Sequence, residues 1–285
     1  MPMSRRIGRI VTVPPVGPGF GGPAHTAAAV IPPVDFKATD PFFVMMDDRI
    51  STAGAFGEAH PHAGLETVTF MLHGSMEDLE GKLEEGDVEW MTAGSGIVHA
   101  EEVVVSDGMR LLQLWVVLPE AQRRIAPRVQ RLARDAMPVR REPGVEARIY
   151  SGRSRGLKAP TLNAVPVTLV DIRLLPGAIF DQELQSSYNG FLVALEGAVT
   201  AGDSPTPLAA GQVGWLDRPA QVGESVLTVR AGAEGARVLL YAGEPQNISL
   251  AVRGPFIAGS EAELAECFAA YRRGDFPRAS TLRGR

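Results

Sequence analysis

The apolar residues of this chain are gathered in short runs that alternate with polar residues or are rich in β-branched side chains. Glycine, proline, aspartate and serine separate the runs. Short runs of this kind, bounded by turn residues, are typical of β-strands. The pattern therefore predicts an all-β fold, with strands at 67–72, 96–98, 111–118, 167–175, 190–195, 225–229 and 237–241.

One segment near the end of the chain shows a helical pattern instead. Ser260 and Glu263 form a capping box, and Gly274 is placed to end a helix. The apolar residues between them recur at the spacing of one helix face: Leu264, Cys267, Phe268 and Tyr271. We expect a short C-terminal helix that packs on the fold and carries no chemistry.

The two halves of the chain repeat one pattern. Gly74 is followed twelve residues later by Gly86 and then by Trp90, and Gly197 is followed fourteen residues later by Gly211 and then by Trp215. A chain of 285 residues is long enough for two such units. We therefore predict two tandem β-barrels, at 1–135 and 136–258, followed by a helix and tail at 259–285.

Composition and charge narrow the class of protein. A net charge of −5 gives no general attraction to nucleic acid, and no apolar run reaches the length of a membrane-spanning helix. Prolines and glycines at 14–19 interrupt any signal-peptide core, and Cys267 is the single cysteine. These features predict a cytoplasmic protein that binds neither nucleic acid nor membranes.

Charge is unevenly distributed along the chain. Acidic residues crowd 77–89, where we expect an exposed hairpin. Ten arginines lie between 121 and 155: Arg123, Arg124, Arg128, Arg131, Arg134, Arg140, Arg141, Arg148, Arg153 and Arg155. Because prolines interrupt this stretch, we interpret it as a solvated connector, with a patch for an acidic partner or a polynucleotide as the alternative.

All five histidines fall in the first 99 residues, at His25, His60, His62, His73 and His99. His60 and His62 are two residues apart before a strand-like run, so both should project from one face. His99 and Glu101 have the same spacing. Three histidines and a carboxylate would suit a metal with open coordination positions, with Glu66 as a competing carboxylate. We interpret His25 and His73 as ordinary structural residues.

The segments around these residues resemble the pirin family of the cupin superfamily. The resemblance is carried by Asp40-Pro41-Phe42, by 60–68 with its H-P-H, and by 86–101 with its W-M-T-A-G-x-G-I-x-H-x-E run. It continues through 112–116 and, more weakly, through 243–245 and 254–256. The segment 120–190 carries little of it.

Membership of that family would imply two cupin-type barrels (a bicupin) with one mononuclear metal, usually Fe(II), in the N-terminal barrel. The family's ligands match His60, His62, His99 and Glu101, which favours Glu101 over Glu66. Three histidines and a carboxylate also suit Mn, Ni, Cu or Zn. Ala63, Leu65 and Glu102 depart from the residues common beside the ligands, which affects the expected substrate preference.

Two functions follow as hypotheses. Some pirins act as quercetin 2,3-dioxygenases, so the resemblance implies an oxygenase of small aromatic or enol substrates that uses O2, with Glu101 as catalytic base. Other pirins resemble metal-dependent coregulators, so the alternative is a regulatory protein that binds a protein partner without turnover. The resemblance leans towards an enzyme; an open apolar cavity of ligand size over the metal would favour that interpretation, and a narrow, closed pocket would favour the alternative.

Overall fold

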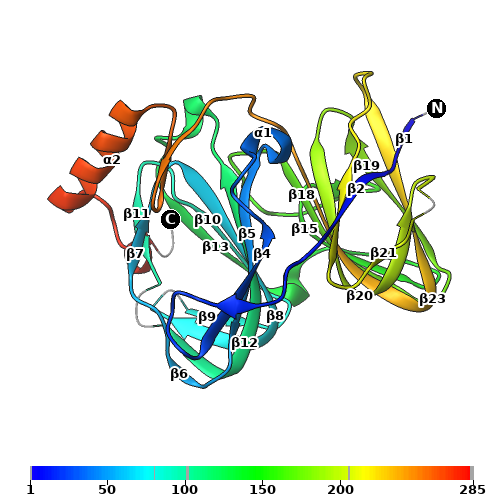
Figure 1. Cartoon of the computed structure of the whole chain (residues 1–285), viewed down its shortest axis with the longest axis horizontal. Coiled ribbons are helices and arrows are strands. Elements are labelled where there is room, and N and C mark those ends of the chain that lie inside the picture. Colours follow the sequence, from blue (N-terminus) through cyan, green and yellow to red (C-terminus); the bar gives the residue numbers. More distant parts are fainter. Residues whose placement is uncertain (1, 80, 101–102, 205, 283–285) are drawn as a thin grey trace. The chain divides into compact units, whose positions relative to one another are not determined.

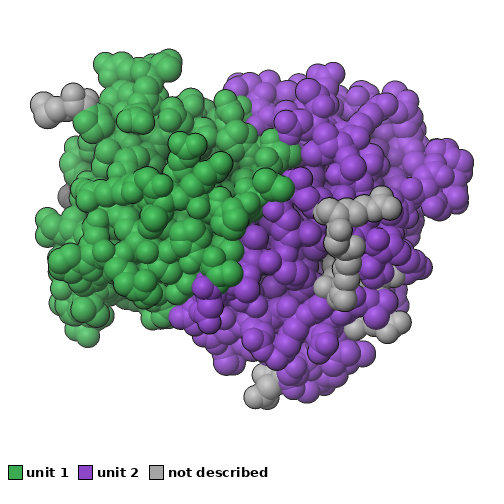
Figure 2. Space-filling model, turned by 180° about the vertical axis from the view of Figure 1, so that it is seen from behind, with its two compact units in different colours: residues 1–13, 136–245 green, residues 14–135, 246–285 purple. Residues whose placement is uncertain are grey.

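The computed structural model describes residues 2–79, 81–100, 103–204 and 206–282. The chain divides into two compact units (Figure 2). Unit 1 comprises Met1–Val13 and Ala136–Pro245, and unit 2 comprises Pro14–Asp135 and Gln246–Arg285. The sequence analysis placed the segments in chain order. The structure instead groups the first residues with the second barrel and the C-terminal segment with the first.

Unit 2 is built on one large antiparallel sheet with the strand order β13-β10-β8-β12-β5-β4-β3 (Figure 1). A small sheet, β7 with β11, carries the three predicted histidine ligands, and β24 pairs with β25. The strands are β3 (Gly17–Pro18), β4 (His25–Ile31), β5 (Phe42–Ile50), β6 (Gly54–Ala55), β7 (His60–His62), β8 (Leu65–Asp78), β9 (Gly81–Glu84), β10 (Val88–Thr92), β11 (Ile97–His99), β12 (Val104–Val117), β13 (Arg128–Leu132), β24 (Ala251–Arg253) and β25 (Phe256–Ala258).

Unit 1 repeats this arrangement with the order β14-β15-β18-β23-β20-β22-β2. The strands are β1 (Met3–Arg5), β2 (Ile7–Thr12), β14 (Val139–Glu142), β15 (Val145–Ser151), β16 (Arg153–Ser154), β17 (Leu157–Lys158), β18 (Val167–Leu174), β19 (Ile179–Gln185), β20 (Asn189–Ala201), β21 (Leu208–Ala209), β22 (Gln212–Leu216) and β23 (Glu224–Gly243). Strand β2 pairs with β22 as β13 pairs with β10, which explains why the N-terminal residues belong here.

The predicted repeat is present in both units. Trp90 lies in β10 opposite Val68 of β8, and Trp215 lies in β22 opposite Phe191 of β20. Each tryptophan strand thus borders the long hairpin strand of its own unit. The prediction of an all-β protein with two duplicated barrels is confirmed.

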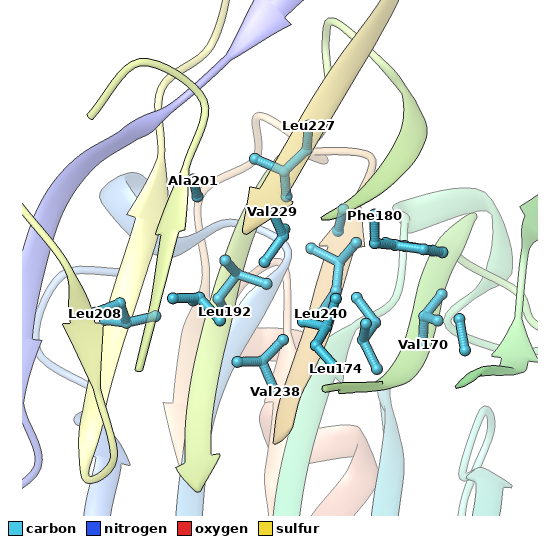
Figure 3. Packing of buried hydrophobic residues seen from close by; sticks show 14 of the residues in the cluster. Val170, Leu174, Phe180, Leu192, Ala201, Leu208, Leu227, Val229, Val238 and Leu240 are labelled. Atoms are coloured by element: carbon cyan, nitrogen blue, oxygen red, sulfur yellow. The ribbon is translucent and has the colours of Figure 1, made fainter. Parts of the chain in front are cut away.

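Apolar side chains fill the interior of unit 1 (Figure 3). Residues from strands on both sides of the unit meet there, and Val170, Phe180, Leu192 and Leu240 are fully buried. Glu183, which occupies the offset equivalent to His60, lies away from this core and forms an ion pair with Arg155. The interior of unit 1 is therefore a packed apolar core, and no histidine lies in this unit.

The C-terminal helix α2 (Glu261–Arg273) forms as predicted. The Ser260 hydroxyl accepts a hydrogen bond from the Glu263 N–H, and Gly274 ends the helix with a left-handed φ of 79°. The remaining helical segments are α1 (Phe36–Thr39) and the 3-10 turns η1 (Glu120–Gln122), η2 (Arg134–Ala136) and η3 (Ala279–Leu282). No helix among the described residues combines the length and apolar character needed to cross a membrane.

The arginine-rich stretch is strand structure and not a solvated connector. Strands β13, β14 and β15 lie in it, and several of its guanidinium groups form ion pairs within their own unit. Arg123 pairs with Glu263, Arg131 with Asp78 and Glu89, and Arg140 with Glu142. Asp78 and Glu89 have 3% exposed side chains, so the acidic segment is only partly the exposed hairpin that we expected.

Candidate metal centre

Three histidines of unit 2 converge on one point. Ligand-type nitrogens of His60, His62 and His99 all lie within 4.8 Å of one another. The Nε2 atoms of His60 and His99 are 3.1 Å apart. His62 and His99 are buried and His60 is half-buried. The structure thus brings together the three imidazoles that the sequence analysis selected.

The pairing of β7 with β11 produces this convergence. The two strands are antiparallel, with Ile97 opposite His62 and His99 opposite His60. Alternation along each strand then turns these four side chains to one face, while Pro61 and Val98 face the other way. Strand β11 ends at His99, because Ala100 has a left-handed φ of 61°.

Backbone carbonyls fix the orientation of two of the rings. The Nδ1–H of His60 donates to the Glu58 carbonyl at 2.9 Å, and the Nδ1–H of His62 donates to the Pro255 carbonyl at 3.3 Å. Because a carbonyl only accepts, Nδ1 carries the proton in both rings. The Nε2 atom of each neutral ring is therefore left as a lone-pair donor, the usual arrangement in metal-binding histidines.

Burial keeps two of these imidazoles neutral. Desolvation, reinforced by His60, lowers the pKa of His62 to about 3 although the Pro255 carbonyl acts in the opposite direction. Desolvation also holds the pKa of His99 well below its usual range, with His62, His60 and Arg131 adding to the effect. Neutral imidazole is the form that binds a metal ion, so this cluster is ready to bind one at neutral pH.

The spacing of the cluster fits a shared metal ion. Two imidazole nitrogens bound to one ion at about 2.1 Å and at right angles lie about 3 Å apart. The separation of the His60 and His99 Nε2 atoms is 3.1 Å, and the oriented lone pairs of His60 and His62 suit the same ion. The residues present therefore fit a mononuclear metal.

Of the two candidate carboxylates, the structure describes Glu66 but not Glu101. Glu101, the predicted fourth ligand, lies outside the described residues. Glu66 is fully buried and accepts a hydrogen bond from the Thr92 hydroxyl at 2.7 Å. It alternates along β8 with Thr67, which pairs with Trp115, so Glu66 faces the opposite side of the sheet from the tryptophan that contacts His62. The described geometry gives Glu66 no place among the ligands.

The C-terminal segment forms backbone hydrogen bonds beside β7 and with β11. The Ile257 N–H donates to the Ala63 carbonyl at 3.0 Å, and the Val98 N–H donates to the Pro277 carbonyl at 2.9 Å. Gly64 has a φ of 78°, and a Cβ there would lie 1.8 Å from the Ile257 carbonyl oxygen. Residues 254–282 therefore run along the outside of β7 and β11, where Figure 1 shows α2.

Two residues beside H-P-H that depart from the family pattern contact the C-terminal segment. Ala63 is buried in an apolar cluster with Phe256 and Leu264, and Leu65 packs against Ile257. Both side chains thus contact the C-terminal segment. The sequence analysis singled out Ala63 for its effect on substrate preference, and its buried position gives it a packing role.

An aromatic and polar surface faces the histidines from the large sheet. The Trp115 ring lies edge-on to His62, with centroids 4.9 Å apart, and Phe43 stacks on Trp115 at 6.3 Å. Two residues along β12 from Trp115, the Gln113 side chain accepts a hydrogen bond from the Thr69 hydroxyl at 2.6 Å. The sequence analysis missed these residues, although their alternation with buried leucines could have placed them on one face.

His25 and His73 lie outside the cluster, as we expected. The buried His25 contacts Asp48 at 2.7 Å through Nε2 and accepts the Gly21 N–H through Nδ1. Desolvation raises the pKa of Asp48, against the effect of His25. His73 is exposed and lies 3.4 Å from Glu85. His25 is therefore an internal anchor for the loop before β4.

Comparisons with known proteins agree with this geometry. The family model described as Pirin matches residues 30–116, and the Pirin C-terminal cupin domain matches residues 169–277. Pirin-like protein 2 of Arabidopsis thaliana is 34% identical over 80% of this chain and 73% of its own length.

Solved structures show the same likeness. Protein GK1651 of Geobacillus kaustophilus is 40% identical, with a TM-score of 0.79 over 87% of this chain and 100% of that one. Quercetin 2,3-dioxygenase of Acinetobacter baumannii is 24% identical, with a TM-score of 0.81 over 96% of this chain and 98% of that one. The latter likeness is one of fold, and both units are cupin-like.

Proposed function

The chain belongs to the pirin family, and from that premise we propose that it is a mononuclear non-haem metal oxygenase of the quercetin 2,3-dioxygenase type. The observation that carries the proposal is the convergence of three imidazoles, two of them oriented by backbone carbonyls, beside an aromatic surface. A structural zinc site is normally closed by four ligands in a tetrahedron, whereas three histidines and one carboxylate leave positions for substrate on a metal that takes five or six ligands.

His60, His62 and His99 would hold the metal through Nε2, and Glu101 is proposed as the fourth ligand. We propose Fe(II), with Mn, Ni, Cu or Zn as the other metals that this donor set suits. When bound, the metal would supply Lewis acidity and the means to activate O2. The protein's own part is to keep the imidazoles neutral, to hold the substrate and to exclude water.

The proposed substrate is a flavonol-like enol. Its 3-hydroxyl would lose a proton to the Glu101 carboxylate, and Trp115 and Phe43 would contact its planar rings. One O2 would be consumed, the central ring would open, and one carbon monoxide would leave with an ester of a phenolic carboxylic acid. The quercetin 2,3-dioxygenase with a similar fold bears the name of this reaction.

Aerobic incubation of metal-quantified protein with quercetin tests the proposal. We expect the flavonol absorbance band to disappear. The moles of oxygen taken up and of carbon monoxide released should each equal the moles of flavonol consumed. The His99→Ala variant should show none of these at the same protein concentration. Full metal occupancy without oxygen uptake would remove the proposal.

The regulatory alternative finds less support. It used the arginine-rich stretch as a docking surface, but Arg123, Arg131 and Arg140 form ion pairs within their own units. A pull-down with metal-free and metal-loaded protein separates the two functions, since a sensor would change its partners with the metal. The cytoplasmic location stays a prediction that rests on the single cysteine.

A further inference from the structure

The face of the large sheet that looks toward the histidines remains accessible to solvent. Val44 pairs with Trp115 and Met46 pairs with Gln113, and all four side chains are half-buried. Their neighbours on the opposite face of the same strands are fully or almost fully buried: Met45, Leu112 and Leu114. Unit 1 differs, because its interior is filled by apolar side chains (Figure 3). The inward surface in unit 2 is therefore available to a ligand.

This surface combines the apolar side chains of Trp115, Val44 and Met46 with the Gln113 amide and the hydroxyls of Thr67 and Thr69. Ligand sites commonly combine apolar walls with a few polar groups that fix orientation. Gln113 lies two residues from Trp115 on the same strand face, which places their Cα atoms roughly 7 Å apart. Because the Trp115 ring contacts His62, a molecule bound at the histidines and lying along this face would extend toward Gln113.

The orientation of the amide is set by its neighbour. The Thr69 hydroxyl donates to Gln113 Oε1 at 2.6 Å. With the oxygen engaged there, the NH2 group is directed elsewhere, and it donates to no other residue in the part of the chain that the structure describes. Gln113 therefore presents two N–H donors beside an apolar surface, which suits an acceptor oxygen on a ligand.

We infer that Gln113 determines substrate specificity by donating a hydrogen bond to an oxygen at the end of the substrate remote from the histidines. This inference rests on the proposed function for the other end, where the substrate's hydroxy-ketone would bind. The substrate class is then a planar, fused-ring aromatic that carries a hydroxyl or carbonyl oxygen on the ring beyond the metal-binding group. Thr69 acts as a positioning residue, because it holds the amide in the donating orientation.

Anaerobic binding titrations test the inference without turnover. The probes are quercetin and 3-hydroxyflavone, which keeps the hydroxy-ketone but lacks the ring hydroxyls. We expect Gln113→Leu to weaken quercetin binding about 3- to 10-fold, the effect of one lost hydrogen bond. Its affinity for 3-hydroxyflavone should stay within about twofold of the original. Thr69→Val should weaken quercetin binding by a smaller factor than Gln113→Leu does, and it should likewise leave the affinity for 3-hydroxyflavone nearly unchanged.

Met46→Leu is the matched control, since Met46 pairs with Gln113 on the same face and offers no donor. Its preference for quercetin over 3-hydroxyflavone should equal that of the original protein. Metal content and unfolding temperature are measured for every variant, so that loss of fold is separated from loss of recognition.

The outcomes distinguish this inference from the proposed function. Equal weakening of both probes by Gln113→Leu, or no weakening of either, would overturn the role of Gln113 even if the protein consumes oxygen. Quercetin binding that depends on Gln113 without oxygen uptake would support the recognition role and reject the dioxygenase. Binding of neither probe by the original protein would overturn both.

Discussion

The Nδ1 atom of His62 lies 3.3 Å from the carbonyl oxygen of Pro255, 193 residues away in the chain. This hydrogen bond directs the His62 lone pair toward His60 and His99, so the C-terminal segment takes part in building the candidate metal centre. The same segment contacts both ligand strands through Ile257 and Pro277. Metal affinity should therefore depend on residues that cannot themselves bind metal.

Removal of one imidazole should empty the centre. We expect His99→Ala to lower metal affinity more than roughly 100-fold, since loss of a ligand should exceed the effect of removing a group behind it. Titration against a chromophoric chelator measures the affinity, and elemental analysis identifies the metal. His73→Ala is the control, because its exposed ring lies outside the cluster. Unchanged occupancy in His99→Ala would show that the metal binds elsewhere.

The contact between Gly64 and Ile257 should be sensitive to a single methyl group. Gly64→Ala would place a Cβ 1.8 Å from the Ile257 carbonyl oxygen and would strain a φ of 78°. We expect unfolding free energy to fall by about 3 kcal/mol or more, together with metal affinity. Gly177→Ala is the matched control, because its φ is 70° and its Cβ would meet nothing within 4 Å. It should cost only about 1 kcal/mol. Equal effects of the two variants in urea unfolding would contradict the steric argument.

The metal-free protein should lose stability as the pH falls from 6.5 toward 3. Burial lowers the pKa of His62 to about 3 and lowers that of His99, whereas the unfolded chain binds protons near the ordinary value of 6.5. The unfolded state binds more protons than the folded state in this pH window. The stability contributed by keeping His62 and His99 neutral is therefore fully present above pH 6.5 and is lost as the pH falls below it. For His62 alone the full loss is roughly 5 kcal/mol.

Urea unfolding in the presence of EDTA at a series of pH values measures this dependence. The His62→Gln variant should show a shallower decrease, because its side chain does not titrate. A slope equal to that of the original protein would mean that His62 is not held neutral by burial.

His25 should matter for stability and not for the metal. His25→Ala removes the partner of the buried Asp48 and the acceptor of the Gly21 N–H. We expect a loss of about 2–4 kcal/mol in unfolding free energy with unchanged metal content. His73→Ala should stay within about 0.5 kcal/mol of the original protein. Loss of metal from a folded His25→Ala protein would assign His25 to the centre after all.

Local signals in the sequence predicted much of this structure. Ser260, Glu263 and Gly274 predicted α2 because capping depends on residues close in the chain. The spacing of His60 and His62 predicted a shared face because strand alternation is local as well. The same argument does not extend from His99 to Glu101. Ala100 has a left-handed φ and ends strand β11, so strand alternation no longer predicts the direction of the next side chain.

Distant pairings were beyond sequence reasoning. The pairing of β2 with β22 and the bond from His62 to Pro255 join residues about two hundred positions apart. The carbonyl of Pro255 is a backbone group, so the residue type gave no indication of it. The arginines of 121–155 were misinterpreted for a related reason, since their carboxylate partners Asp78 and Glu263 lie in segments far from them in the chain.

Unit 2 contains residues from both before and after the second barrel in the chain, so it can be completed only late in synthesis. Strands β7 and β11 are translated early, but residues 254–282 follow only after every strand of the second barrel has been made. A nascent chain that stops within the second barrel would carry His60, His62 and His99 without the carbonyl and the strand contacts that hold them. Tight metal binding would then be a late step, because it requires residues that are translated after the strands of both barrels.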